Sequence, residues 1–358
     1  MKIMFVTPGM TYGGAERVIS ILCNEWDKKK HIVRIIITGD NGQCVYPLSK
    51  GVGCICLGGL NETNKHPHLE LIKKIREEIS KEKPDVVVTF MNDICAYTAI
   101  AMFGLKIPLI YSERNDPKKV NQSRKDKIYR KIAENFSEGI VFQTCGAQKC
   151  YSKRVQKKST IILNPMNIMD LPECDYNRVK KEIVTVGRLE AQKNHKLLID
   201  AFEKMADIFP EYNLKIYGTG SLENKLKEQI QKLHLESRVL LMGNSSHVLD
   251  DIKQAAQFVL SSDFEGLPNS LIEAMALGLP CISTDCSPGG AREVIKDGEN
   301  GLLTKCGNVG ELAKAMRYLL ENKDKAYEFG RKAKCVREKV ESSYIANCWI
   351  EFIEQFLK

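Results

Sequence analysis

Short apolar segments alternate with longer amphipathic segments along all 358 residues, and this alternation constrains the fold more than any other feature of the chain. Lys2–Thr7 predicts a first buried strand, and from Ala15 onward apolar residues recur at helical spacing. Strands that alternate with helices pair into a parallel sheet with right-handed crossovers. The first half of the chain predicts further strands at 32–38, 53–57, 85–90, 108–112, 139–142 and 160–163, and further helices at 69–81, 93–103, 124–135 and 146–154.

A second series of the same kind begins near Glu182, and it predicts a second parallel sheet. Its strands are expected at 182–186, 214–217, 239–242, 258–260 and 281–284. Its helices are expected at 194–209, 221–234, 248–255, 269–277, 291–295 and 310–321. The last ~35 residues predict helices throughout, because their apolar residues recur at helical spacing.

The segment between the two series has two prolines and no clear period, which is typical of a linker. We therefore predict a first domain at 1–163, a linker at 164–180 and a second domain at 181–340. Residues 341–358 predict a C-terminal helix that packs back toward the first domain. The fold class that follows is α/β, with two Rossmann-like domains that face each other across a cleft.

The composition is that of a globular protein, with 43% hydrophobic and 27% charged residues. No apolar run approaches the ~18 residues of a membrane-spanning helix, and the N-terminal apolar run is too short for an export signal. These observations predict a cytoplasmic protein. Thirteen scattered cysteines without metal-ligand spacing predict buried, reduced thiols.

The net charge of +8 is concentrated in one segment, Lys106–Lys158. This segment contains fourteen Lys and Arg residues against five Asp and Glu residues. Such a basic surface suits an anionic membrane surface or an acceptor that carries a diphosphate. Nucleic acid, or a solvated helix face without a partner, are the alternatives.

A glycine turn, Gly13 and Gly14, lies between the first predicted strand and the first predicted helix. Open α/β sheets bind their ligands at the carboxyl ends of strands, so backbone amides at this turn are candidates for a phosphate contact. The alternative is a tight turn that only needs a positive φ.

The segment Asp263–Pro280 places two carboxylates, Glu265 and Glu273, on either side of a predicted helix start. Gly266 permits a close backbone approach, Pro268 suits the first turn, and a helix start offers free N–H groups to a phosphate. The two acids would accept hydrogen bonds from ligand hydroxyls. The alternative is that both are solvated charges.

Two cations, Arg188 and Lys193, follow the first strand of the second series, which also brings them to a carboxyl edge. Together with the helix start and the glycine turn they predict a diphosphate site, although each cation alone is more often a surface charge. Gly218-Thr219-Gly220 lacks the third glycine of an NAD fingerprint, since Glu223 occupies that position. The sequence has no Asp-x-Asp, which favours protein cations over a divalent metal, so we expect no metal or other cofactor.

Five segments carry a resemblance to a known family. They are GGAE at 13–16, VGRLEAQKNH at 186–195, YGTGSLEN at 217–224, SSDFEGLPNSLIEAMALGLPCIST at 261–284 and AREVIKDGENGLL at 291–303. With them the chain resembles the retaining glycosyltransferases of family 4, which have the GT-B fold. It is similar in particular to bacterial enzymes that extend undecaprenyl-diphosphate-linked saccharides, including N-acetylgalactosamine transferases and transferases of capsule or O-antigen type.

The resemblance implies a UDP-sugar donor, a lipid-linked saccharide acceptor, transfer with retention at the inner face of the plasma membrane, and no nucleic acid partner. It implies catalytic roles for Glu265, Arg188 and Lys193. It implies donor contacts for Gly13, Gly14, Gly218, Gly243, Asn244, Gly266, Leu267, Pro268, Asn269, Ser270, Leu271 and Glu273. On the acceptor side it implies Asn92, Arg114, Lys118 and Lys119, where Arg114 stands at a position that is histidine in many relatives.

Two other functions stay open at this point. One is a nucleotide-sugar epimerase of the same fold, and the other is a non-catalytic partner that binds a nucleotide sugar.

Overall fold

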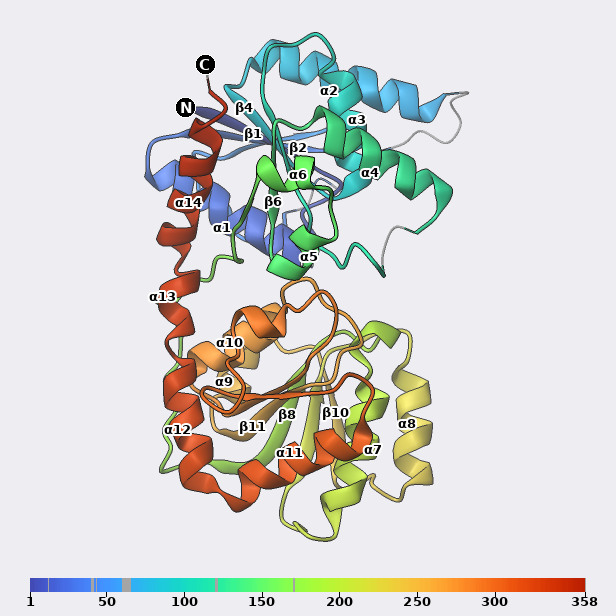
Figure 1. The fold of residues 1–358 in the computed structure, drawn as a ribbon, viewed down its shortest axis with the longest axis vertical. Coiled ribbons are helices and arrows are strands. Elements are labelled where there is room, and N and C mark those ends of the chain that lie inside the picture. Colours follow the sequence, from blue (N-terminus) through green and yellow to red (C-terminus); the bar gives the residue numbers. More distant parts are fainter. Residues whose placement is uncertain are drawn as a thin grey trace. The chain divides into compact units, whose positions relative to one another are not determined.

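The computed structural model describes residues 1–11, 13–39, 42, 44–59, 66–119, 122–169 and 171–357. The chain divides into two compact units (Figure 1). The first consists of Met1–Asn167 and Val340–Lys358, and the second of Ile168–Lys339. The chain therefore leaves the first unit once and returns to it at its C-terminal end.

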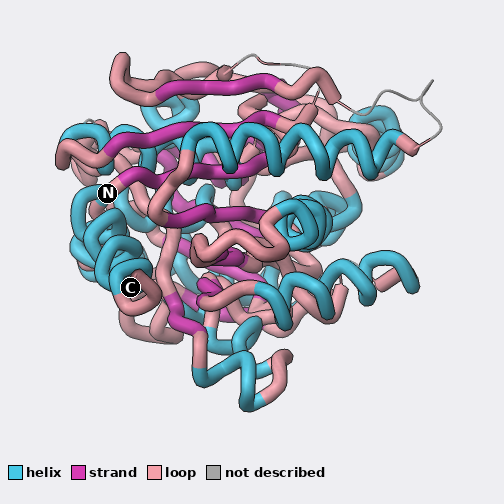
Figure 2. The backbone as a smooth tube through the Cα atoms, turned by 90° about the horizontal axis from the view of Figure 1, so that it is seen from above, coloured by secondary structure: helices cyan, strands magenta, loops and turns pink. Residues whose placement is uncertain are grey.

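The first unit contains a parallel sheet of seven strands in the order β3-β2-β1-β4-β5-β6-β7. Figure 2 shows strands side by side with helices on both sides of them. Every pair of neighbours is parallel, as the alternation of strands and helices predicts. The strands are β1 (Lys2–Thr7), β2 (Ile32–Ile37), β3 (Gly53–Cys56), β4 (Val86–Phe90), β5 (Leu109–Ser112), β6 (Gly139–Phe142) and β7 (Ser159–Ile161).

Helices cover both faces of this sheet. Helix α1 (Gly14–Lys28) packs against α14 (Ser342–Glu354) on one face. Trp26 and Trp349, both fully buried, meet edge to face there, and the Trp26 indole N–H donates to the Ala346 carbonyl at 3.1 Å. On the other face lie α2 (Pro67–Glu82), α3 (Asn92–Ala101), α4 (Arg124–Phe136), α5 (Cys145–Lys149) and α6 (Lys153–Lys157).

The second unit contains a parallel sheet of six strands in the order β10-β9-β8-β11-β12-β13. Both sheets thus have the Rossmann strand order, and the predicted α/β class with two Rossmann-like domains is confirmed. The strands are β8 (Lys180–Val186), β9 (Asn213–Tyr217), β10 (Val239–Gly243), β11 (Ala255–Leu260), β12 (Cys281–Thr284) and β13 (Leu302–Thr304). The α-helices are α7 (His195–Ala206), α8 (Glu223–Lys232), α9 (Val248–Ile252), α10 (Asn269–Leu277), α11 (Val309–Glu321), α12 (Lys323–Ala333) and, crossing into the first unit, α13 (Val336–Val340). Ala191–Lys193 and Ala291–Glu293 form short 3-10 helices, η1 and η2.

Several predicted element bounds were wrong. The helix expected at 146–154 is two short helices, because the Ser152 side chain accepts from the Val155 N–H and starts a new helix. The helix expected at 248–255 ends at Ile252, and β11 already begins at Ala255. Strand β13 was missed, since its three residues are too few for a clear period.

The cysteine prediction was wrong in part. All thirteen are free thiols, but Cys54, Cys56, Cys145 and Cys335 are exposed, and only five of the thirteen are buried. A cysteine's burial depends on the face of the element it occupies, which composition does not report. Separately, the described part of the chain contains no helix with the length and apolar content of a membrane span.

Candidate functional site

The strand order of the second unit brings two loops together at the carboxyl edge of its sheet. Strands β8 and β11 are neighbours, although about 70 residues separate them in the chain. The chain proceeds from β8 to β9 on one side and from β11 to β12 on the other, which makes this pair the topological switch point. Arg188 and Lys193 follow β8, and Glu265 follows β11, so the strand order places all three at this point.

Lys193 and Glu265 form an ion pair there. The Lys193 ammonium lies 2.5 Å from a Glu265 carboxylate oxygen, and the two side chains are only 14% and 7% exposed. The same oxygen accepts from the Ser262 hydroxyl at 2.7 Å, and the other oxygen lies 3.3 Å from the Gln192 amide nitrogen. The carboxylate is therefore satisfied by three donors in a nearly dry site.

The backbone of the two loops holds this pair in place. Asn194 adopts the left-handed conformation, with a φ of 44°, and its side chain caps helix α7. Its amide also donates to the Asp263 carboxylate at 2.8 Å, while the Asp263 N–H donates to the Gln192 carbonyl at 2.9 Å. The two loops are therefore joined by two direct hydrogen bonds.

Arg188 lies beside the pair without joining it. Its guanidinium is 3.5 Å from the Gln192 side-chain oxygen, and its backbone carbonyl contacts the His195 Nε2 at 3.2 Å. Burial lowers the pKa of His195 to about 4, so this imidazole is neutral at physiological pH.

Helix α10 begins next to Glu265. Pro268 is the N-cap residue, one position earlier than the predicted first turn, and its carbonyl accepts the Ile272 N–H at 3.2 Å. Asn269 and Ser270 are partly exposed at the helix start, whereas Leu271 and Glu273 are buried. The helix ends at Leu277, as predicted, and Gly278 follows it in the left-handed conformation.

The loop after β12 packs against the segment that precedes helix α10. The Glu265 N–H donates to the Ser287 carbonyl at 3.0 Å. A Cβ on Gly290 would lie 2.0 Å from the Gly266 carbonyl oxygen, so only glycine fits at position 290. The segment from Glu265 to Pro268, in which Leu267 is buried, is thus packed against the loop after β12.

Two further predicted glycines line the same edge of the sheet. The Gly218 N–H donates to the Gly243 carbonyl at 2.7 Å, and both residues have a positive φ. A Cβ on Gly218 would lie 2.1 Å from the Gly187 carbonyl oxygen, so glycine here allows the ends of β8 and β9 to approach. Asn244 follows and is exposed.

In the first unit, Gly13 and Gly14 stand where β1 gives way to α1. Gly13 has an extended backbone with a φ of −179°, so the alternative of a turn that needs a positive φ was wrong for it. A Cβ on Gly13 would lie 2.0 Å from a Glu16 carboxylate oxygen, so a larger residue here would require the Glu16 side chain to move.

The residues predicted for the acceptor side divide into two kinds. Lys118 and Lys119 are exposed. Arg114 and Asn92 are buried at the carboxyl ends of β5 and β4. The Arg114 guanidinium lies 3.8 Å from the centroid of the Phe90 ring and donates to the Asn164 side-chain oxygen at 2.8 Å. Burial lowers the pKa of Arg114 to about 9, which leaves it charged at neutral pH.

A buried carboxylate beside Arg114 was missed. Glu113 accepts from the hydroxyls of Tyr111 and Tyr151 at 2.9 and 2.7 Å, and from the N–H groups of Arg114 and Asn115. The signal in the sequence was an acid directly after a buried strand. In the second unit Gln192, His195 and Ser262 were also missed, although all three lie inside the two motifs quoted above.

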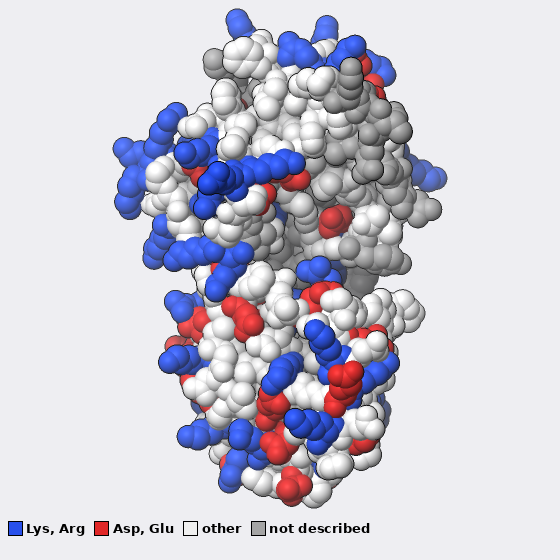
Figure 3. Space-filling model, turned by 90° about the vertical axis from the view of Figure 1, so that its right-hand side faces the viewer, with Lys and Arg blue, Asp and Glu red and all other residues white. Residues whose placement is uncertain are grey.

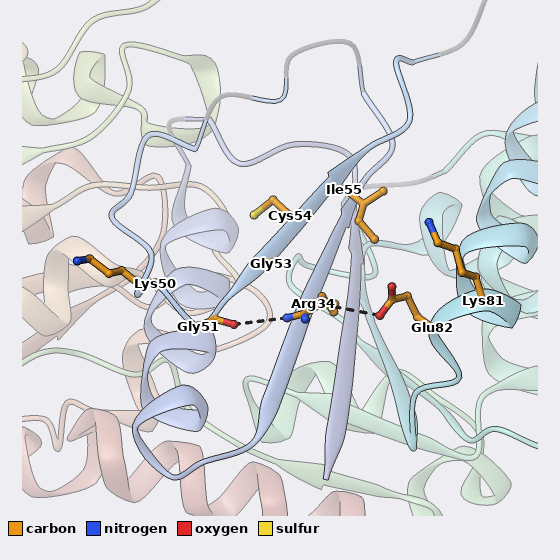
Figure 4. Close-up of a pocket in the computed structure, with 8 residues that line it drawn as sticks. All are labelled: Arg34, Lys50, Gly51, Gly53, Cys54, Ile55, Lys81 and Glu82. Atoms are coloured by element: carbon orange, nitrogen blue, oxygen red, sulfur yellow. Dashed lines mark hydrogen bonds and ion pairs between the residues drawn. The ribbon is translucent and has the colours of Figure 1, made fainter.

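The described residues contain no cluster of three or more His, Cys, Asp or Glu side chains that could hold a metal ion. A pocket of about 370 Å³ lies elsewhere, at edge strand β3, and is lined by charged residues that include Arg34, Lys50, Lys81 and Glu82 (Figure 4). It contains no residue of the predicted site.

Comparison with known families gives two matches, one for each unit. Residues 12–163 match the family described as Glycosyltransferase Family 4, and residues 175–336 match the family described as glycosyl transferases group 1. Together they span most of the chain.

Two bacterial proteins are similar over nearly their whole length. The chain is 28% identical to a Campylobacter jejuni protein over 368 residues, which cover 99% of each chain. That protein is named GalNAc-alpha-(1->4)-GalNAc-alpha-(1->3)-diNAcBac-PP-undecaprenol alpha-1,4-N-acetyl-D-galactosaminyltransferase. The chain is also 26% identical over 328 residues to an uncharacterized glycosyltransferase of Haemophilus influenzae, with 91% of this chain and 92% of that protein covered.

Solved structures share the fold. Anabaena HepE in complex with UDP superposes with a TM-score of 0.82 at 19% identity, covering 99% of this chain and 100% of that one. A glycosyltransferase from Rickettsia africae gives a TM-score of 0.84 at 21% identity, with 100% and 98% covered. At these identities the likeness concerns the fold alone, which is the predicted GT-B type.

Proposed function

This chain belongs to the glycosyltransferases of group 1 and family 4, and we propose that it moves a hexose or N-acetylhexosamine from a UDP-sugar to a lipid-diphosphate-linked saccharide. One observation carries the proposal: the Lys193–Glu265 pair at the switch point of the second sheet, next to the start of α10. A cation, a carboxylate and a helix start within one site suit a ligand that has phosphates and hydroxyls on neighbouring atoms.

A sugar nucleotide has this chemistry at both ends of its diphosphate. We propose that Glu265 accepts a hydrogen bond from a donor-sugar hydroxyl, while Lys193 contacts the adjacent phosphate. Glu273 would receive the ribose hydroxyls, and the chain from Gly266 to Leu271 would flank the diphosphate with backbone amides. Gly218, Gly243 and Asn244 would line the nucleotide side, and Gly13 and Gly14 would contact the distal phosphate.

The proposed chemistry is displacement at the anomeric carbon with retention. The bond from the anomeric carbon to the phosphate oxygen breaks while the acceptor hydroxyl attacks the same face, and the leaving phosphate oxygen takes the acceptor proton. Negative charge grows on the diphosphate as this happens. Arg188 and Lys193 would stabilise that charge, and a preorganised donor of this kind typically contributes about 10² or more to the rate. This mechanism requires no divalent metal.

The acceptor proposal has two supports. The Campylobacter relative is named for a diphospho-undecaprenol saccharide. The basic segment Lys106–Lys158 also presents its cations outward: eleven of its fourteen Lys and Arg side chains are exposed, whereas Glu113 and Asp116 are buried. The exposed residues of the segment therefore carry a larger excess of positive over negative charge than the buried residues do. Lys and Arg side chains gather on the first unit in the face that Figure 3 presents.

Helix α4 joins these cations to exposed apolar side chains. Ile128 and Phe136 are 57% and 51% exposed on this helix, among Arg124, Lys125 and Lys131. A basic helix with outward apolar residues is typical of a protein that lies on an anionic membrane surface. We propose this surface, at the inner face of the plasma membrane, as the place where the enzyme meets its acceptor.

Transfer itself is tested with a panel of UDP-sugars and lipid-linked saccharides, by following UDP release and the extended product. We expect Lys193→Ala and Glu265→Gln to lower kcat/KM by about 10² or more. Lys196→Ala is the matched control, because Lys196 is exposed and pairs with Asp200 on the same helix. Near-normal turnover of Lys193→Ala would contradict the proposal. A new sugar nucleotide without acceptor would indicate an epimerase, and binding without turnover would indicate a non-catalytic partner.

Membrane binding is tested separately by sedimentation with anionic and zwitterionic vesicles. We expect binding to anionic vesicles that weakens with salt, and a loss of binding in the triple variant Lys125→Gln/Ile128→Ser/Lys131→Gln. The control is Lys225→Gln/Lys232→Gln on α8, whose lysines are also exposed. Vesicle binding that does not change with salt concentration would exclude α4 as the membrane-binding surface. An equal loss of binding in the α8 variant would exclude it as well.

A further inference from the structure

Two thiols meet at the open edge of the first sheet. Cys54 lies on β3, the last strand at that edge, and Cys44 lies in the connection from β2 to β3. Their Sγ atoms are 3.8 Å apart. Cys54 is exposed and Cys44 is half-buried, so small molecules reach the pair from solvent.

The surrounding backbone holds the two thiols against each other. Cys44 forms a bridge with Met10, and the Val45 N–H donates to the Met10 carbonyl at 2.9 Å. A Cβ on Gly42 would lie 3.3 Å from the Cys56 Cβ, so the same connection also packs on β3. Figure 4 shows Cys54 and Ile55 projecting to opposite sides of β3, so Ile55 does not separate the two thiols.

We propose that Cys44 and Cys54 form a site of reversible oxidation that takes a hydroperoxide as its oxidant and closes into a disulfide. The Cys44 thiolate attacks the peroxide, an S–O bond forms, the O–O bond breaks, and the leaving oxygen departs as water or alcohol. Cys54 then attacks the sulfur of the Cys44 sulfenic acid. The S–S bond forms, the S–O bond breaks, and hydroxide leaves as water with the proton released by Cys54. Two thiols lose two electrons, and one peroxide gains them.

The order of the two steps follows from the surroundings of Cys54. Burial and the neighbouring Cys44 raise the pKa of Cys54 to about 12, so Cys54 is a thiol at neutral pH and a poor first nucleophile. Conversion of Cys44 to a sulfenic acid replaces the neighbouring thiol group, which is one of the causes of the raised pKa of Cys54. The resolving step therefore becomes easier once the first step has occurred.

The disulfide would tie the edge strand to a segment that is already hydrogen bonded to Met10. Met10 is fully buried in the connection between β1 and α1, and this connection ends at Gly13, directly before Gly14 starts the helix. The segment that contains Cys44 is therefore hydrogen bonded to the segment that leads to the glycine turn.

The test treats the full chain with hydrogen peroxide, blocks the remaining thiols by alkylation and maps the peptides by mass spectrometry. We expect a peptide pair joined through Cys44 and Cys54, an intact mass lower by two hydrogens, and reversal by dithiothreitol. Cys56→Ser is the matched control, because Cys56 is exposed on the same strand two residues away, and it should form the same disulfide as the wild type.

Cys44→Ser and Cys54→Ser should each lose this cross-link completely. The peptide map of the wild type shows whether the Cys44–Cys54 disulfide forms, even if a variant folds poorly. Separate alkylation of Cys44 and Cys54 after peroxide, stable addition of oxygen at Cys44, or a cross-link to Cys56 instead would overturn the proposal.

Discussion

Removing either partner of the Lys193–Glu265 pair should destabilise the second unit, and by unequal amounts. Lys193→Ala leaves a carboxylate that is 7% exposed without its cation. Loss of one partner from a buried pair costs about 3–5 kcal/mol. Because Ser262 and Gln192 still donate to Glu265, we expect the lower end, about 3 kcal/mol, or roughly a hundredfold in the folding equilibrium. Glu265→Gln should cost less, about 1–2 kcal/mol, because Lys193 is 14% exposed and can reach water.

The double variant Lys193→Ala/Glu265→Gln leaves no unpaired charge, so its cost should fall short of the sum of the single variants by about 1–2 kcal/mol. Urea unfolding without nucleotide measures this. Both tryptophans lie in the first unit, so their fluorescence follows that unit, whereas far-UV circular dichroism follows both. Lys196→Ala should change stability by less than about 0.5 kcal/mol, since that pair is exposed. Single-variant costs that add within about 0.5 kcal/mol would refute the buried-pair argument.

Two further predictions concern the second unit. The pKa of His195 falls from 6.5 in the unfolded chain to about 4 in the fold, so the unfolded chain binds more protons between these values, and stability should rise with pH from about 4 to 6.5. His195→Gln should flatten that part of a stability profile measured by urea unfolding, and an unchanged slope would contradict the assignment to His195. Gly218→Ala should prevent correct folding of the second unit, because its Cβ would lie 2.1 Å from the Gly187 carbonyl oxygen, whereas Gly243→Ala, with a φ of 69° and open space, should cost only about 1 kcal/mol. Soluble yield and melting temperature separate the two, and equal behaviour would show that the close approach at Gly218 does not matter.

The sequence alone was sufficient wherever a local rule decides the structure. Helix α10 has the predicted bounds, because proline and glycine mark its two ends and its own hydrogen bonds form between near neighbours. The helix expected from residue 194 is α7, and Asn194 caps it through a hydrogen bond to the near neighbour Leu197. The alternation of apolar and amphipathic segments was also enough for two parallel sheets, since parallel strands need crossover helices.

Tertiary structure alone decided which side chains meet. The contact of Lys193 with Glu265 requires β8 and β11 to be neighbours, and hydrophobic period along each strand does not report which strand lies beside it. The burial of Arg114 against Phe90 depends in the same way on β4 lying beside β5, and the charge of an arginine by itself predicts exposure. Local hydrogen bonds and periodicity depend on residues that are close in sequence. Strand order, and the contacts between neighbouring strands, depend instead on the packing of several elements into one core.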